Sequence, residues 1–169
     1  HDLIEAFEHY KRLDPNSRLI IVGSFDPSDN YCRRITQIVK DSKVKDSIFI
    51  VGKVNEQELY TYYRLGDLFW SMSEHEGFGV PLLEAMWFDI PVLAFSKCAV
   101  SETMGNGGIL FYDKCDMAKL SALAYTINHD KRLKKAIISN QRSHRTKFLP
   151  EKMNSRIDFI IKNLNRSPP

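Results

Sequence analysis

Residues 76–85 read Glu-Gly-Phe-Gly-Val-Pro-Leu-Leu-Glu-Ala, and they follow shortly after the apolar run Leu68–Trp70. The two glycines permit a tight turn and let a ligand approach the main chain closely, and Pro81 suits the first turn of a helix. The N–H groups that open a helix have no partner inside it, so they form a site for an anion. The stretch therefore predicts a strand, a glycine loop and a helix, with Glu76 and Glu84 beside the helix start. A sugar nucleotide carries both the phosphates and the hydroxyls that such a site can hold.

Short apolar runs alternate with helical patterns on both sides of this stretch. We expect strands at 18–22, 48–51, 68–72, 91–95 and 108–112. We expect helices at 3–10, 29–42, 56–65, 81–88, 116–129, 131–147 and 150–164, and one helical turn at 101–104. Asn55 and Glu58 form a capping box at the start of the third helix. The β-α-β-α order predicts an α/β fold, a Rossmann-like doubly wound parallel sheet with helices on both faces.

In such a sheet, ligands bind outside the carboxyl ends of the strands, where the glycine loop is expected. A doubly wound domain normally opens with a strand, whereas this chain opens almost directly in a helix, so we expect the first strand to lie upstream of His1. We expect residues 1–148 to form one Rossmann-like domain and residues 149–169 a C-terminal helix and tail.

Composition is that of a soluble globular protein, with 43% hydrophobic and 27% charged residues. The net charge is +3, and many of the cations lie in residues 131–147. Such a run is usually a solvated helix face, and the alternative is a peripheral contact with an anionic membrane surface. We expect no nucleic-acid partner.

Three scattered cysteines (Cys32, Cys98 and Cys115) form no Cys-x-x-Cys motif, so they suggest neither a zinc site nor a disulfide framework. A cytoplasmic location is expected on this basis. A peripheral contact of the basic run would then be with the inner face of the membrane. No apolar run approaches the length of a membrane-spanning helix.

The stretch Ser73–Met86 resembles the donor-site signature of retaining glycosyltransferases of family 4, which have the GT-B fold. Their E-x7-E pair corresponds here to Glu76 and Glu84. Further pieces of the resemblance, each weak alone, follow in the right order at Asp2–Phe7, Leu19–Gly23, Phe49–Val54, Ile90–Ala94 and Ser101–Glu102. The resemblance covers most of the chain and implies the C-terminal, donor-binding half of a two-domain enzyme. The acceptor would mainly contact the N-terminal domain.

By this resemblance, Glu76 is the catalytic-site carboxylate that holds donor-sugar hydroxyls, and Glu84 binds the ribose diol. The donor sugar or its phosphates would contact the loop at Gly77, Phe78, Gly79 and Val80. The nucleobase would lie against Lys53, Val54 and Asn55. These roles suit the residues, because a carboxylate accepts hydrogen bonds from two vicinal hydroxyls at once. Glu84 also stands among apolar neighbours, where a carboxylate needs a partner, and a ribose would be one.

The reaction implied is transfer of a sugar from a nucleoside diphosphate to a hydroxyl acceptor, with retention of the anomeric configuration. The acceptor would belong to polysaccharide, lipopolysaccharide O-antigen or glycolipid synthesis. No Asp-x-Asp occurs, so we expect neither a metal nor a cofactor. The family also carries an Arg and a Lys that neutralise the diphosphate, at positions that would precede His1. Because stabilisation of a departing phosphate is mostly electrostatic, the isolated chain is expected to be inactive and to bind donor weakly.

Other interpretations remain open. The chain could be a non-catalytic sugar-nucleotide-binding domain, or an epimerase of the same fold, although the E-x7-E pair is not expected there. An NAD-binding domain is disfavoured, because Gly23 is followed by Ser24 and Phe25 rather than by a G-x-G-x-x-G motif. Two residues near the signature have simpler interpretations: His75 as a solvated or structural histidine, and Ser101 as a helix N-cap.

Overall fold

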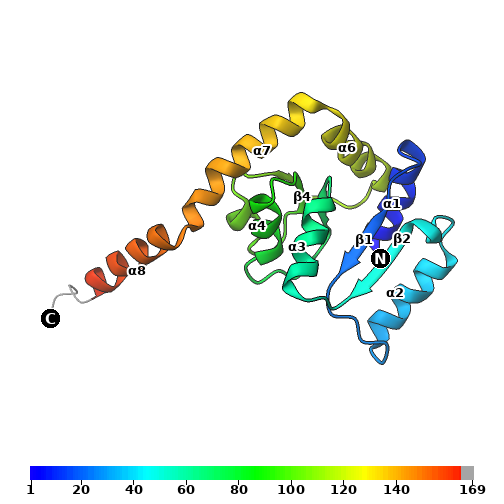
Figure 1. Ribbon diagram of the computed structural model, residues 1–169, viewed down its shortest axis with the longest axis horizontal. Coiled ribbons are helices and arrows are strands. Elements are labelled where there is room, and N and C mark those ends of the chain that lie inside the picture. The colour runs from blue at the N-terminus through cyan, green and yellow to red at the C-terminus, as the bar shows by residue number, and fades with distance from the viewer. Residues whose placement is uncertain (165–169) are drawn as a thin grey trace.

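Strands and helices alternate along the chain in this computed structural model, which describes residues 1–164 (Figure 1). The strands are β1 (Leu19–Val22), β2 (Ile48–Gly52), β3 (Phe69–Ser71), β4 (Val92–Phe95) and β5 (Ile109–Phe111). The helices are α1 (Asp2–Leu13), α2 (Asn30–Asp41), α3 (Glu56–Leu65), α4 (Val80–Trp87), α5 (Val100–Met104), α6 (Met117–His129), α7 (Lys131–Arg145) and α8 (Pro150–Leu164). Short 3-10 turns lie at Lys45–Ser47 and Thr146–Phe148.

These elements confirm the predicted strands and helices, with small shifts at their ends. Helix α5 begins at Val100, so Ser101 lies inside the helix, and its interpretation as the N-cap is wrong. The helix expected over 131–147 ends at Arg145, and the chain continues as a 3-10 turn before α8 begins. Residues 165–169, which belong to the tail expected at 149–169, lie outside the described residues.

Every strand pair is parallel, as the alternating pattern predicts. The sequence predicts one sheet, and in the described residues the strands divide into two. One sheet pairs β1 with β2, and the other has the order β3-β4-β5. Strands β1 and β3 do not pair with each other, so each keeps an unpaired edge within the described residues.

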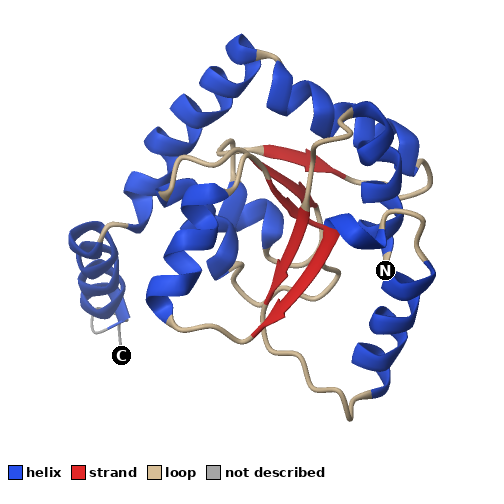
Figure 2. Cartoon of the chain, turned by 45° about the vertical axis from the view of Figure 1, so that its right-hand side comes forward, coloured by secondary structure: helices blue, strands red, loops and turns tan. Residues whose placement is uncertain are grey.

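Helices cover both faces of β4, whose residues Val92, Leu93 and Ala94 are fully buried. Leu93 packs in one core with residues of α1, α2 and α6, whereas Val92 and Ala94 pack in a second core with residues of α3, α4 and α5. Successive side chains of a strand point to opposite faces, so these two cores lie on opposite sides of the sheet. Figure 2 shows the helices around the strands. The predicted layers are therefore confirmed at β4.

Of the two C-terminal helices, α7 lies against the body of the molecule and α8 leaves it. Helix α7 packs against α4 and α6, and α8 extends away from the other elements (Figure 1). Met153 and Ile157 are exposed on α8. None of the described helices combines the length and apolarity that a membrane crossing requires.

Candidate functional site

The glycine loop, residues 73–79, connects the carboxyl end of β3 to the first turn of α4. Gly79 is the N-cap of α4 and has a left-handed backbone, with φ of 77°. The left-handed backbone angle favours glycine, and a Cβ added at Gly79 would lie 2.8 Å from Cδ1 of Leu82, so that the Leu82 side chain would have to shift. Helix α4 begins at Val80, one residue before the start expected at Pro81. The predicted order of strand, glycine loop and helix is confirmed.

The backbone N–H groups of the loop are available for a ligand. In the described residues, no acceptor within hydrogen-bond range is found for the amides of Gly77, Phe78, Gly79 and Val80. The carbonyl of Gly79, in contrast, accepts from the amide of Leu82 at 3.0 Å and so closes the first helical turn. Unpaired amides at a helix start carry partial positive charge. The loop can therefore bind an anion with its main chain.

The two carboxylates of the signature have different surroundings. Glu76 is half-buried in the loop, and its side chain has no hydrogen bond or ion pair in the part of the chain that is described. Glu84 is half-buried in α4 and accepts a 2.9 Å hydrogen bond from the hydroxyl of Tyr63 in α3. The partner that Glu84 needs is thus present in the protein, and sequence reasoning missed Tyr63. Burial, followed by the hydrogen bond to the Glu84 carboxylate, raises the pKa of Tyr63 far above its ordinary value.

The residues expected at the nucleobase lie at the carboxyl end of β2. Lys53 and Asn55 are exposed, and Val54 is half-buried between them. The capping box is confirmed: the side-chain oxygen of Asn55 accepts from the amide of Glu58 at 3.0 Å, and Glu58 accepts from the amide of Asn55 at 2.9 Å. The oxygen of Asn55 is therefore engaged in the helix, while Lys53 remains exposed. No hydrogen bond joins this segment to the glycine loop in the described residues.

A lysine far away in the sequence holds the start of the glycine loop. The ammonium of Lys114 lies 2.9 Å from the carbonyl oxygen of Met72, 2.9 Å from the Glu74 carboxylate and 2.8 Å from the Asp2 carboxylate. It also lies 4.4 Å from the centre of the Phe95 ring. Burial opposes its charge, but the hydrogen bonds to both carboxylates outweigh burial and raise the pKa of Lys114. The hydrogen bond from Lys114 in turn lowers the pKa of Glu74. Two carboxylates already neutralise Lys114, so it does not replace the diphosphate-binding cations of the resembled family.

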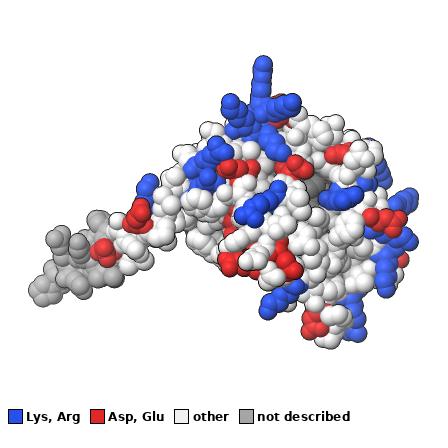
Figure 3. Space-filling model, in the orientation of Figure 1, with Lys and Arg blue, Asp and Glu red and all other residues white. Residues whose placement is uncertain are grey.

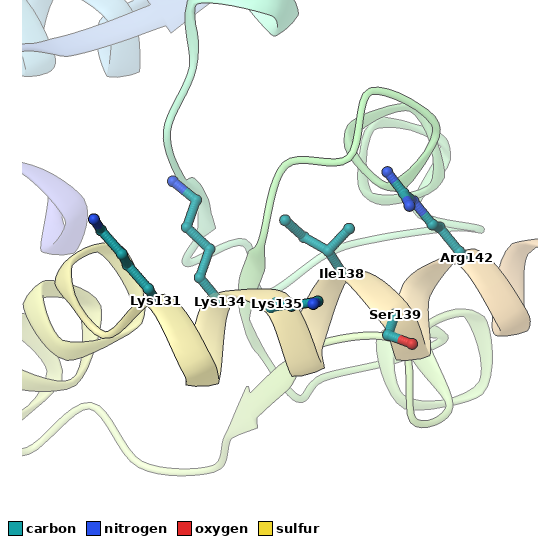
Figure 4. Close-up of a pocket in the computed structure, with 6 residues that line it drawn as sticks. All are labelled: Lys131, Lys134, Lys135, Ile138, Ser139 and Arg142. Carbon is teal, nitrogen blue, oxygen red and sulfur yellow. The ribbon is translucent and has the colours of Figure 1, made fainter.

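The basic helix expected over 131–147 is present as α7. A hollow of about 400 Å³ lies along it, and Figure 4 shows the side chains that line this hollow. Figure 3 shows Lys and Arg side chains gathered where α6 meets α7. The residues that line the hollow are Lys131, Lys134, Lys135, Ile138, Ser139 and Arg142. Two of the cations have carboxylate neighbours: Lys134 lies 3.7 Å from Asp67, and Arg142 lies 2.6 Å from Asp89. None of these lining residues belongs to the glycine loop.

Sequence and structure comparisons place the chain among known proteins. The family model described as "Glycosyl transferases group 1" matches residues 1–144. An alpha-monoglucosyldiacylglycerol synthase of Acholeplasma laidlawii is 32% identical over 120 residues, which make up 70% of this chain and 29% of that protein. The chain thus spans less than a third of the length of this relative.

Two solved structures are similar in fold. The C-terminal domain of a glycosyl transferase group 1 family protein, LpcC of Francisella tularensis, has a TM-score of 0.72 at 25% identity, and the match covers 86% of this chain and 76% of that chain. Anabaena Alr3699/HepE in complex with UDP has a TM-score of 0.80 at 22% identity, over 96% of this chain and 44% of that chain. These likenesses confirm the expected fold, the Rossmann-like C-terminal half of a GT-B glycosyltransferase.

Proposed function

The chain belongs to the group 1 glycosyl transferases, and we propose that it is the donor-binding domain of a retaining glycosyltransferase of family 4. The observation that carries this proposal is the glycine loop, where unpaired amides lie between two half-buried carboxylates at a helix start. In our proposal, residues 1–148 form this domain, and residues 149–169 lie C-terminal to it. We also propose that the isolated chain is inactive, because Lys114, the lysine that contacts the start of the glycine loop, is already engaged by two carboxylates.

The proposed donor is a nucleoside-diphosphate sugar. One similar structure, that of Anabaena Alr3699/HepE, is a complex with UDP, which supports this donor class. We assign the sugar hydroxyls to Glu76 and the ribose diol to Glu84. One carboxylate oxygen of Glu84 would bind the ribose while the other accepts the hydrogen bond from Tyr63. The sugar and phosphates lie against Gly77, Phe78, Gly79 and Val80. The nucleobase lies against Lys53, Val54 and Asn55.

The chemistry follows from where charge develops. As the bond between the anomeric carbon and the phosphate oxygen breaks, negative charge grows on the leaving diphosphate and positive charge on the sugar ring. The loop amides stabilise the negative charge on the leaving diphosphate. Glu76 orients the sugar for attack on the face from which the diphosphate leaves, which retains the anomeric configuration. These are roles in recognition and positioning, with no proton transfer assigned to either carboxylate. Neither a metal nor a cofactor is part of the proposal.

The proposed acceptor is a glycan or a lipid-linked hydroxyl, bound mainly by an N-terminal domain. The relative of Acholeplasma laidlawii is named as a synthase of a glucosylated diacylglycerol, which supports a glycolipid acceptor. Polysaccharide and lipopolysaccharide O-antigen synthesis are the other acceptor pathways in the proposal. The protein would work in the cytoplasm, with α7 in peripheral contact with the inner face of the membrane.

Substitution of the two carboxylates in the full-length protein tests this function. Donor affinity and sugar transfer are measured with UDP-, GDP- and ADP-sugars for the parental protein, Glu76→Gln and Glu84→Gln. We expect at least about ten-fold weaker donor binding for each variant, because a hydrogen bond to a charged acceptor contributes roughly 1.5–3 kcal/mol. Glu5→Gln, at an exposed position of α1, is the matched control.

Parental values for both variants would contradict the proposed roles of the carboxylates. Donor binding without transfer or donor hydrolysis by the parental protein would instead identify a non-catalytic sugar-nucleotide-binding domain. Conversion of the donor sugar to its epimer would identify an epimerase.

A further inference from the structure

The end of the glycine loop is held from behind by a buried threonine. The hydroxyl of Thr103, in α5, donates a hydrogen bond to the carbonyl oxygen of Phe78. Thr103 is only 3% exposed, and its neighbours Val100 and Met104 are buried in the core beneath α4. The hydrogen bond therefore connects the glycine loop to a buried residue of the core.

A buried histidine supports this threonine from α7. Nε2 of His144 lies 2.8 Å from the carbonyl oxygen of Thr103, so it must carry the proton that it donates. The imidazole also packs tightly against the turn after α5, because a Cβ added at Gly105 would lie 2.4 Å from Cε1 of His144. His144 is 4% exposed. The position of Thr103 is thus fixed from both sides, by its own helix and by α7.

Aromatic contacts close the arrangement. The ring of Phe148 meets the ring of Phe78 edge to face, with centroids 5.9 Å apart, and lies 5.6 Å from the ring of His144. Such contacts favour one relative placement of the rings. The side chain of Phe78 and its carbonyl are therefore both restrained, by Phe148 and by Thr103 respectively.

The direction of one peptide group follows from these restraints. The carbonyl of Phe78 and the N–H of Gly79 belong to the same planar, trans peptide unit, so they point in opposite directions. Because Thr103 draws the carbonyl toward α5, the N–H of Gly79 must point away from α5. That N–H is one of the unpaired amides of the loop.

We propose that Thr103 is a positioning residue for the donor: its hydroxyl fixes the Phe78–Gly79 peptide so that the Gly79 N–H faces the sugar-diphosphate. His144 acts indirectly, because its hydrogen bond to the Thr103 carbonyl holds Thr103 in place. The inference rests on the proposed function, and it adds a residue that lies outside the E-x7-E signature. Without the Thr103 hydroxyl, the peptide would be free to rotate, and its dipole would no longer be aligned with the phosphate charge.

Two substitutions at Thr103 separate the hydroxyl from the packing. Thr103→Val keeps the branched shape and removes the hydroxyl, and Thr103→Ser keeps the hydroxyl. In the full-length protein, dissociation constants are measured for UDP-glucose against uridine and for GDP-mannose against guanosine. The nucleoside alone has no phosphate or donor sugar, so it reports the ribose and base contacts only.

We expect Thr103→Val to weaken the binding of the sugar nucleotide by about five- to ten-fold, as the loss of one hydrogen bond implies. Nucleoside binding should stay within about two-fold of the parental value, and Thr103→Ser should restore sugar-nucleotide binding. A structural effect on the whole domain would weaken both ligands together. If Thr103→Val does not fold, Thr103→Ala removes the same hydroxyl and gives the same comparison.

The outcomes distinguish this inference from the function on which it rests. An unchanged ratio of the two dissociation constants in Thr103→Val, with normal donor binding by the parental protein, would overturn the role of Thr103 and leave the proposed function intact. Absence of donor binding by the parental protein would overturn both.

Discussion

At the scale of single residues, Glu84 shows how a half-buried carboxylate is kept in one orientation. Its own helix provides only apolar neighbours, and the hydroxyl of Tyr63 reaches it from α3 at 2.9 Å. Tyr63 is 8% exposed, and its ring stacks on Phe88 with centroids 5.2 Å apart. The hydroxyl is thus held by packing, and it leaves the other carboxylate oxygen free to accept from a ligand.

Replacement of Tyr63 by Phe tests this support. We expect Tyr63→Phe to lower the free energy of unfolding by about 1 kcal/mol at pH 7, since a half-buried carboxylate loses its partner. The pKa of Tyr63 is raised in the folded state above its ordinary 10.0, so the unfolded chain ionises first. The hydroxyl's contribution is therefore complete below pH 10 and is lost as the pH rises beyond it.

Denaturant unfolding at pH 7, 9 and 11 measures this effect. The difference between the parental protein and Tyr63→Phe should be constant up to pH 9 and should shrink at pH 11. Tyr31→Phe, at a position that is 59% exposed, is the control and should change stability little. A difference that grows above pH 10 would contradict the direction of the pKa shift.

At the scale of elements, the sequence predicts the helices and strands because their causes are local. Asn55 and Glu58 lie three residues apart, and that spacing alone predicts the start of α3. The contacts that hold the glycine loop have no such local signal. Lys114 is 40 residues from Glu74, and Thr103 is 25 residues from Phe78. The loop and its carboxylates could therefore be predicted, whereas the side chains that support them required the fold.

Helix α7 is a second element that the sequence describes only in part, because several of its cations are paired with carboxylates in the structure. The sequence shows a run of cations, but Arg142 and Arg145 both bind the Asp89 carboxylate, and Lys134 has Asp67 as a neighbour. The hydrogen bond from Arg142 lowers the pKa of Asp89, so this pair stays charged well into the acid range. These cations serve to attach α7 to the body. Lys131 and Lys135 are exposed and line the hollow of Figure 4.

The proposed membrane contact therefore predicts an effect from these two lysines. In the full-length protein, we expect Lys131→Gln with Lys135→Gln to weaken binding to vesicles with anionic phosphatidylglycerol by about thirty-fold at low salt, because each lysine near such a surface contributes roughly 1 kcal/mol. Vesicle co-sedimentation measures the partition. Lys40→Gln with Lys43→Gln, which removes the same charge from exposed positions in and just after α2, is the matched control. Equal partition of both double variants would show that α7 does not contact the membrane.

At the scale of the whole molecule, the two sheets are protected to different degrees. Strand β4 pairs on both sides and is covered on both faces, so its residues Val92, Leu93 and Ala94 are inaccessible to water. Strands β1 and β2 pair only with each other in the described residues. Ile20 and Phe49 lie opposite each other in that pair and are 41% and 45% exposed. A two-stranded pair with one exposed apolar face is a weak unit by itself.

Amide hydrogen exchange tests this difference in the 169-residue chain. The β4 amides of Leu93 and Ala94 should exchange only with global unfolding, and the β1 amides of Ile20 and Ile21 should exchange at least about ten-fold faster, through local opening. The β4 amides, already paired on both sides, serve as the internal reference. Equal protection of β1 and β4 in the 169-residue chain would mean that the shared core of α1 and α6 stabilises both sheets as one cooperative unit.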